Sequence, residues 1–145
     1  MAVKYLPEGF HTVTPFLSVA DLPQTIDFLE QAFGAEATEL TTRPDGTPWH
    51  GEVRIGDSMV MLSQAQGEWK PNQSSLYLYV PDADTTYRRA LAAGATSVME
   101  PTDTFYRNRE CGVKHGGGNY WWIATRVAEV SREEVERRAR SDVKH

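Results

Sequence analysis

Short stretches in which hydrophobic and polar residues alternate make up much of this chain, and two stretches with helical spacing interrupt them. Alternation with a period of two predicts half-buried β-strands, whereas apolar residues at every third or fourth position predict an amphipathic helix. The first helix is expected to begin after Asp21 as N-cap and to end at Gly34, with its apolar stripe formed by Leu22, Ile26, Leu29 and Phe33. Strands are expected over residues 12–19, 36–42, 49–55 and 58–64, which gives the order β-α-β-β-β.

The second half of the chain repeats this order of elements. We expect a strand over Ser75–Val80, a helix that is capped by Asp82 or Asp84 and ends at Gly94, and a strand over Thr96–Glu100. The segment FLSVADL…AFGAE corresponds to YLYVPDA…LAAGAT. Two such modules, at residues 12–66 and 75–126, can pair their sheets into one surface. The predicted fold class is therefore α+β, with two tandem βαβββ modules forming a curved mixed sheet, a central cup inside and the helices outside.

The last two strands are expected to form a hairpin over residues 105–125. Three consecutive glycines, Gly116 to Gly118, allow backbone angles that other residues avoid, so a turn is predicted there. Side chains alternate along the second arm of this hairpin. One face of the arm should therefore carry Tyr120, Trp122 and Ala124, and the other should carry Trp121 and Ile123.

A separate helix is predicted at the end of the chain. Ser131-Arg132-Glu133-Glu134 has the pattern of a capping box and opens a charged segment to about Arg140. Residues 1–130 are expected to form one domain, and residues 131–145 a charged helix and tail. The polar faces of that helix indicate a surface appendage or a contact with a second chain.

Composition narrows the range of functions. The 145 residues carry a net charge of −5 and have a pI near 5.3, which argues against general affinity for nucleic acid or for an anionic membrane. Cys111 is the single cysteine, so neither an intrachain disulfide nor a cysteine-based zinc motif is expected. No stretch has the pattern of a signal peptide or the length of a membrane span. These features predict a cytoplasmic protein.

The tandem βαβββ pattern resembles the vicinal oxygen chelate superfamily of glyoxalases, bleomycin-resistance proteins and extradiol dioxygenases. The resemblance extends from Thr12 to about Val130, and TVTPFLSVADL, HGEVRIGDSMVMLSQA and WWIAT are similar to the PhnB-like, glyoxalase-like branch. In the closing hairpin, the Asp-Pro-Phe-Gly turn of that branch is replaced by His115-Gly-Gly-Gly. This replacement removes a rigid proline and an aromatic contact, so a different or looser rim is expected.

The resemblance also implies where metal ligands would stand. Metal-using members of the superfamily place ligands on the first and last strands of each module. The corresponding positions here hold Thr14, Met61, Ser75 and Trp122. A divalent cation requires imidazole or carboxylate donors, which these four residues do not supply. We therefore expect no metal at the usual site and no cofactor.

His50 and Glu52 are the candidate catalytic residues. If Val53 and Ile55 face a helix, then His50, Glu52 and Arg54 face the other way. The His-x-Glu pair could act as a general base with an orienting partner, or supply two ligands of a displaced metal site. Alternatively, the pair forms a solvated polar network with Arg54.

Aromatic and methionine side chains fall on the faces predicted to line the cup. Such a lining suits a planar or apolar small molecule, but it also suits a packed core that fills a collapsed cup. The candidate ligand-binding residues are Phe16, Arg54, Met61, Tyr77, Tyr79 and Trp122, and Met59 lies on the same faces.

Three further side chains carry reactive groups. His115, beside the glycines, could act at a mobile rim, although a solvent-exposed turn histidine is the simpler interpretation, and the same holds for His11. Glu110 adjoins Cys111 and should raise the pKa of the thiol, and no fixed base is evident, so a nucleophilic cysteine is disfavoured.

Three hypotheses for function follow. The first is a metal-independent small-molecule-binding protein of the glyoxalase/bleomycin-resistance type that sequesters a natural product or antibiotic. The alternative is a lyase, isomerase or dioxygenase-like enzyme that uses His50 and Glu52. The third is a subunit used mainly for association. The resemblance and the polar helix after Ser131 together predict a homodimer.

Overall fold

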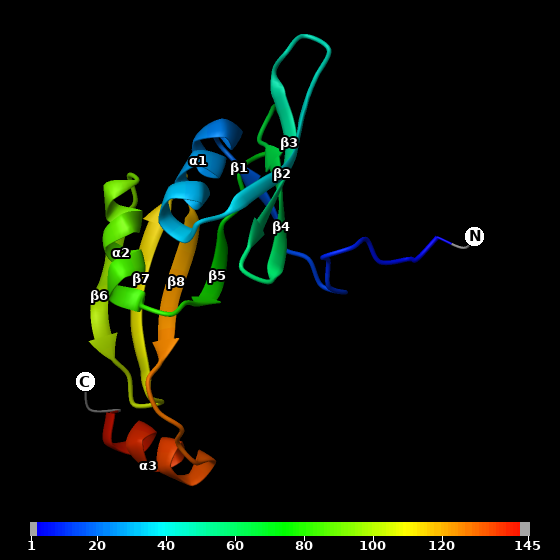
Figure 1. The fold of residues 1–145 in the computed structure, drawn as a ribbon. Coiled ribbons are helices and arrows are strands. Elements are labelled where there is room, and N and C mark those ends of the chain that lie inside the picture. Colours follow the sequence, from blue (N-terminus) through cyan, green and yellow to red (C-terminus); the bar gives the residue numbers. More distant parts are fainter. Residues whose placement is uncertain (1–2, 143–145) are drawn as a thin grey trace.

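The computed structural model describes residues 3–142, and it is an α+β fold of two tandem βαβββ modules (Figure 1). The predicted fold class and the predicted internal repeat are both confirmed. The first module contains β1 (Phe16–Val19), α1 (Leu22–Phe33), β2 (Glu36–Thr42), β3 (Pro48–Ile55) and β4 (Ser58–Gln64). The second contains β5 (Ser74–Tyr79), α2 (Ala83–Ala92), β6 (Thr96–Asp103), β7 (Asn108–His115) and β8 (Asn119–Arg126), and α3 (Arg132–Asp142) follows.

Each module forms its own four-stranded mixed sheet with the same topology. The strand orders are β1-β4-β3-β2 and β5-β8-β7-β6. In each sheet the first and last strands of the module pair in parallel, and the remaining neighbours are antiparallel. β1 and β5 are therefore edge strands, each hydrogen-bonded on one side to the last strand of its own module.

Capping residues set the starts of both long helices. The Asp21 carboxylate accepts a hydrogen bond from the Gln24 backbone N–H, which confirms the predicted N-cap of α1. Gly34 ends α1 in the left-handed conformation, with φ at 68°. At α2 the cap is Asp82, whose carboxylate accepts from the Thr85 N–H. Asp84 lies instead in the first turn of α2.

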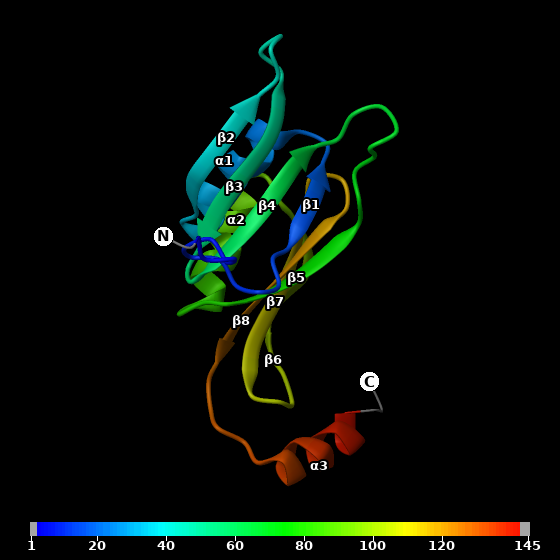
Figure 2. The ribbon, with the colours of Figure 1, turned by 90° about the vertical axis from the view of Figure 1, so that its right-hand side faces the viewer.

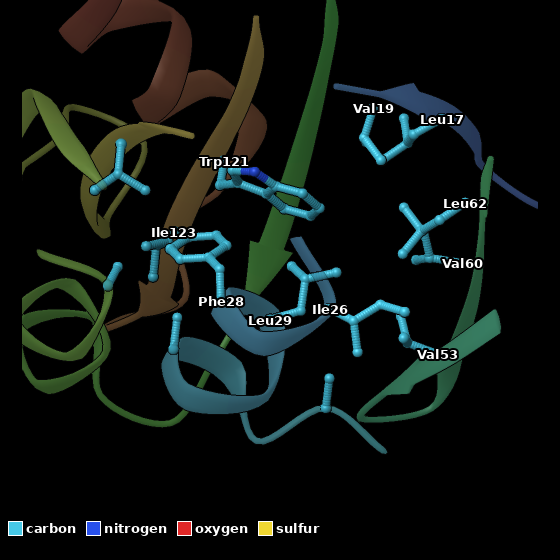
Figure 3. Close-up of a cluster of buried hydrophobic side chains, with 14 of the residues drawn as sticks. Leu17, Val19, Ile26, Phe28, Leu29, Val53, Val60, Leu62, Trp121 and Ile123 are labelled. Carbon is cyan, nitrogen blue, oxygen red and sulfur yellow. The ribbon is translucent and has the colours of Figure 1, made fainter. Parts of the chain in front are cut away.

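One hydrophobic core joins the two modules, and both helices lie in it between the sheets (Figures 1 and 3). Trp121 on β8 is 1% exposed, and its ring centroid lies 6.3 Å from that of Phe28 and 5.6 Å from that of Phe33, both on α1. The first sheet contributes Leu17, Val19, Val53, Val60 and Leu62 to this core, and the second contributes Cys111, Val113, Trp121 and Ile123.

The arrangement of the modules differs from the one expected from the sequence. In place of one curved sheet with helices outside and a cup inside, the chain has two sheets. The inner face of the first packs on α1, that of the second packs on α2, and the two helices pack on each other (Figures 1 and 2). The alternate residues of each strand then form an outer face on the opposite side of each sheet. Within residues 3–142 the two modules thus present two separate outer faces. Several aromatic side chains on these faces are exposed, namely Phe16, Tyr77 and Tyr79.

The remaining differences are at the ends of elements. β1 begins at Phe16 rather than at Thr12, because the Thr14 hydroxyl donates to the His11 carbonyl in a turn that precedes the strand. α3 begins after Ser131, whose hydroxyl accepts from the Glu134 N–H, and it lies beyond the ends of β6 to β8 (Figure 1). The predicted C-terminal tail includes residues 143–145, which lie outside the described residues.

None of the helices in residues 3–142 has the length and apolar character needed to cross a membrane.

Candidate functional site

The outer face of the second sheet carries three of the six predicted ligand-binding residues, namely Tyr77, Tyr79 and Trp122. Cross-strand partners point to the same side of a sheet, so the register defines two rows of side chains on this face. One row is Tyr77, Trp122 and Gly112, and the next row is Tyr79, Ala124 and Glu110. Tyr77 is 44% exposed and Tyr79 is 64% exposed, and their ring centroids are 5.3 Å apart. The structure therefore brings Tyr77, Tyr79 and Trp122 together, as predicted.

Trp122 lies across its neighbouring strand. A Cβ placed on Gly112 would be 2.6 Å from Cζ3 and 2.7 Å from Cε3 of the Trp122 indole. Those distances are shorter than any van der Waals contact, so only glycine leaves room for the indole to cover β7 here. The ring forms a flat apolar surface on the outer face and is only partly buried.

Beside these rings, Glu110 is the acceptor at the centre of a hydrogen-bonded network. Its Oε1 atom accepts from the Tyr106 hydroxyl at 2.7 Å and from the Tyr77 hydroxyl. The Asn108 amide donates to the Tyr77 hydroxyl oxygen at 3.0 Å and to that of Tyr79 at 3.4 Å. Glu110 is 8% exposed, and Asn108 is also buried. The outer face thus combines an aromatic wall with a buried carboxylate.

The electrostatics of this network keep both tyrosines protonated. Burial, followed by the hydrogen bond to Glu110, raises the pKa of Tyr77 far above its usual value of 10.0. The same two causes raise the pKa of Tyr106 to about 12. Both hydroxyls therefore act as hydrogen-bond donors at neutral pH and are unsuited to act as bases.

The outer face of the first sheet carries the predicted catalytic pair. Gly51 and Val53 face α1, so His50, Glu52 and Arg54 face outward, as the alternation predicts. His50 Nε2 lies 3.8 Å from the nearest Glu52 oxygen, and both side chains are partly buried.

Two apolar residues adjoin this pair. Met61 lies between Glu52 and Phe16 in the register, and the Phe16 ring meets the His50 ring edge-on with centroids 6.0 Å apart. The structure thus brings the catalytic candidates beside two of the predicted ligand-binding residues.

Arg54 does not join His50 and Glu52 in a network. Its guanidinium pairs instead with Glu36 on β2, and both side chains are exposed. The interpretation of His50, Glu52 and Arg54 as one polar network is therefore wrong, because the guanidinium extends across the sheet to the neighbouring strand. Arg54 stays on the outer face as a candidate for ligand contact, with one carboxylate already paired to it.

The four metal positions implied by the superfamily do not fit a divalent cation. A hydroxyl, a thioether, a second hydroxyl and an indole supply no imidazole and no carboxylate. The Thr14 hydroxyl is also engaged with the His11 carbonyl. Thr14 and Met61 belong to the first module and Ser75 and Trp122 to the second. Among residues 3–142 there is also no group of three or more His, Cys, Asp and Glu side chains placed to hold a metal ion.

His115 and Cys111 both lie away from the outer faces. The expectation of a solvent-exposed turn histidine is wrong: His115 is half-buried and its ring stacks on Phe28, with centroids 4.0 Å apart and planes 6° apart. Burial lowers the pKa of His115 below 6.5. Cys111 is buried in the core, where burial, and then Asp84 and Glu110, raise its pKa to about 12. That value leaves a thiol rather than a nucleophilic thiolate at neutral pH.

A groove lies beside these faces, at the junction of the modules. Its volume is about 690 Å³, and it runs between the β3–β4 turn and the free edge of β5. Tyr77 and Tyr79 line it on one side, and Phe33, Ile55 and Val60 line it on the other.

Sequence reasoning missed the polar half of the site, which consists of Tyr106, Asn108 and Glu110. A signal was present, because Asn108, Glu110 and Gly112 alternate on the hairpin arm that faces Trp122. Finding it required the pairing of β7 with β8, which places Glu110 opposite Ala124 and beside Tyr79.

The fold defines a class: proteins built from two tandem βαβββ modules, each with a four-stranded mixed sheet. The sequence pattern of the Glyoxalase/Bleomycin resistance protein/Dioxygenase superfamily matches residues 9–123, and the chain belongs to that superfamily. It is 30% identical to the uncharacterized protein Mb0911c of Mycobacterium bovis, over 94% of each chain.

The solved structures that share the fold include TioX and TnmS3. TioX from Micromonospora sp. ML1 has a TM-score of 0.69 at 21% identity, covering 81% of this chain and 99% of TioX. TnmS3, described as an antibiotic binding protein from Streptomyces sp. CB03234, has a TM-score of 0.61 at 19% identity, covering 87% of this chain and 98% of TnmS3. At these identities the likeness concerns the fold.

Proposed function

We propose that this chain is a metal-independent small-molecule-binding protein that sequesters a planar or apolar compound, such as a natural product or antibiotic. The observation that carries the proposal is the outer face of the second sheet. There, Trp122 lies flat across Gly112, and Tyr77 and Tyr79 stand exposed beside it. Exposed aromatic rings around a flat apolar surface favour binding by area burial and stacking. The chain also shares its fold with TnmS3, which is described as an antibiotic binding protein, and this likeness supports the proposed binding function.

We also propose that the binding unit is a homodimer. Phe16 on the first sheet is 49% exposed, and the aromatic residues of the second sheet are exposed too. If the outer face of the first sheet of one chain met the outer face of the second sheet of another chain, both groups of exposed aromatic side chains would be covered. A ligand could then be enclosed between the two faces. The edge strand β5 has a free side through which two chains can adjoin, whereas the backbone of Ser18 on β1 is hydrogen-bonded to Asn72.

Two finer assignments belong to this proposal. The motifs given above support a place in the PhnB-like branch of the superfamily. The single cysteine, held as a buried thiol, supports a cytoplasmic location.

Fluorescence titration tests the binding function. A panel of planar aromatic compounds is titrated into wild type and into Trp122→Phe, which keeps a smaller aromatic ring in place. Saturable quenching with one compound per chain, weakened in the variant, is expected. Absence of saturable quenching by every member of the panel would refute the proposal. Sedimentation at micromolar concentration tests the dimer, and a mass of a single chain would contradict it.

A second candidate function is an enzyme that uses His50 and Glu52. The observation in its favour is the approach of His50 Nε2 to 3.8 Å from a Glu52 oxygen on the same outer face. This distance is longer than a hydrogen bond, so a ligand would have to draw the pair together before Glu52 could orient the imidazole. Turnover of a bound compound that is lost in His50→Gln, with binding retained, would establish the enzyme.

A further inference from the structure

Glu110 is a buried carboxylate with one oxygen engaged and the other free. The hydroxyls of Tyr77 and Tyr106 both donate to Oε1 of Glu110, whereas Oε2 accepts no hydrogen bond from any described residue. No atom of Glu110 is among the fully buried polar side-chain atoms that lack a partner in residues 3–142. Oε2 is therefore reachable from the outer face, although the residue as a whole is 8% exposed.

The network around Glu110 is arranged for a negatively charged acceptor. The Tyr77 hydroxyl oxygen accepts from the Asn108 amide, so its own proton is directed to Glu110. None of the ion pairs among the described residues includes Glu110. Its neighbour Arg109 points to the opposite face, where it pairs with Asp84. Two tyrosine hydroxyls offset part of the cost of burying this carboxylate, and a cation at the free oxygen would offset more of it.

Aromatic rings surround this carboxylate. The hydroxyls of Tyr77 and Tyr106 converge on it directly, and that of Tyr79 is linked to it through Asn108. Trp122 covers Gly112, two residues further along β7. The Tyr77 and Tyr79 rings stand exposed nearby, with centroids 5.3 Å apart, and the face of an aromatic ring attracts a cation that lies over it. The bidentate pairing of a guanidinium requires both carboxylate oxygens, whereas an ammonium group can donate to Oε2 alone.

We propose that Glu110 binds a protonated amine of the ligand, so that the sequestered compound is an aromatic or apolar molecule carrying an ammonium group. This inference rests on the proposed binding function and specifies the chemistry of its ligand. The amine contacts Oε2 and lies among the tyrosines, while the apolar body of the ligand covers Trp122.

Matched pairs of probes test the proposal. 2-Naphthylmethylamine, which is protonated at pH 7, and 2-naphthylmethanol have the same ring and nearly the same shape. A second pair on an anthracene ring covers a larger surface. Titration by calorimetry in about 0.15 M NaCl, which screens distant charges, should give the amine an affinity about 10-fold to 100-fold above that of the alcohol, as expected for one charge-assisted hydrogen bond.

Two glutamate variants locate the source of this preference. Glu110→Gln keeps an oxygen that accepts from both tyrosines but removes the charge, so it should bind the amine and the alcohol with equal affinity. Glu30→Gln makes the same change of net charge at an exposed position on α1 and should keep the full preference. Circular dichroism checks that both variants fold.

The outcomes separate this inference from the proposed function. Equal affinities of amine and alcohol for wild type would overturn the inference and leave the binding function intact, and this comparison needs no variant. A preference that survives in Glu110→Gln, or disappears in Glu30→Gln, would also overturn it. If neither probe of either pair binds wild type, the proposed function fails and the inference fails with it.

Discussion

Replacing Gly112 by alanine should displace the Trp122 indole from the outer face of the second sheet. The added Cβ would lie 2.6 Å from Cζ3, 2.7 Å from Cε3 and 3.3 Å from Cη2 of that ring. Carbon atoms in contact prefer separations of about 3.5–4.0 Å, so the ring has to move by roughly 1 Å. The atoms that would be met belong to the flat face of a rigid ring, which must move as a unit.

The magnitude of the effect follows from two opposing contributions. Insertion of one methyl into a filled site costs about 1–3 kcal/mol when neighbours have to shift. Alanine also restricts the unfolded chain more than glycine does, which stabilises the folded state by about 0.4–1 kcal/mol. The expected net loss in the free energy of unfolding for Gly112→Ala is therefore about 1 kcal/mol, within a range of about 0–2.6 kcal/mol. Trp122 is only partly buried, so the ring has space to move and the fold should survive.

A double-mutant cycle with Trp122→Val tests this reasoning. Valine removes the ring and suits a strand, so Gly112→Ala should stabilise the folded state by about 0.4–1 kcal/mol in that background. Urea unfolding followed by far-ultraviolet circular dichroism gives the four free energies without relying on tryptophan emission. An equal cost of Gly112→Ala in the two backgrounds would show that the indole does not occupy the space over Gly112. Binding of aromatic probes should weaken in Gly112→Ala and remain undetected in both variants that lack the ring.

Three further predictions concern single residues and the metal positions. Cys111, with its pKa raised to about 12 by burial, should react with iodoacetamide at pH 8 many times more slowly in native protein than in urea, and equal rates would contradict its burial. Burial lowers the pKa of His115 below its unfolded value of 6.5, so the folded state binds fewer protons. The stability that neutral His115 contributes is complete above pH 6.5 and declines as the pH falls through that value. His115→Phe keeps a ring on Phe28, so its free energy of unfolding in urea should change less between pH 7 and pH 5 than that of wild type. Purified protein should retain no stoichiometric divalent cation after dialysis, because Thr14, Met61, Ser75 and Trp122 supply no suitable donors; one Zn, Ni, Mn or Fe per chain in elemental analysis would refute this.

Alternation along the strands predicted which residues share a face. Trp121 and Trp122 are adjacent in sequence, and the structure buries the first in the core and places the second on the outer face. The bounds of β2 and β4 are those expected, because turn residues flank both strands. A period of two is enough for such conclusions, since it follows from the geometry of a single strand.

Alternation could not predict what covers each face. Phe33 ends α1 of the first module, but its ring packs on Trp121 of the second. His115 likewise stacks on Phe28, which is distant in sequence. Contacts of this kind depend on how the two modules pack on each other. Nothing in the sequence next to Phe33 or His115 indicates which residue each of them will contact. The Glu110 network was missed for the same reason. Its residues come from β5, from β7 and from the turn before β7, and only the pairing of both strands with β8 brings them together.

The docking of the modules decides how the two halves of the site can be used. Val53 on the first sheet and Trp121 on the second both point into the shared core (Figure 3). The outer residues next to them in sequence, among them Glu52 and Trp122, must therefore point away from that core on opposite layers of the chain. A ligand that contacts Phe16 and Trp122 together would then require the first sheet of one chain and the second sheet of its partner.

Mixing two variants tests whether sites are shared in this way. Phe16→Ala and Trp122→Leu each remove one half of every site and should bind 2-naphthylmethylamine poorly by themselves. When the two variants are unfolded together and refolded at equal concentration, about half of the dimers should contain one of each, given random pairing. In such a dimer both substitutions meet in one site and the other site is intact, so about one quarter of the wild-type capacity should return. If each site lay within a single chain, the mixture would recover no binding capacity, because every chain carries a substitution. That result would refute the site shared between two chains, and binding by wild type would then need a site within one chain.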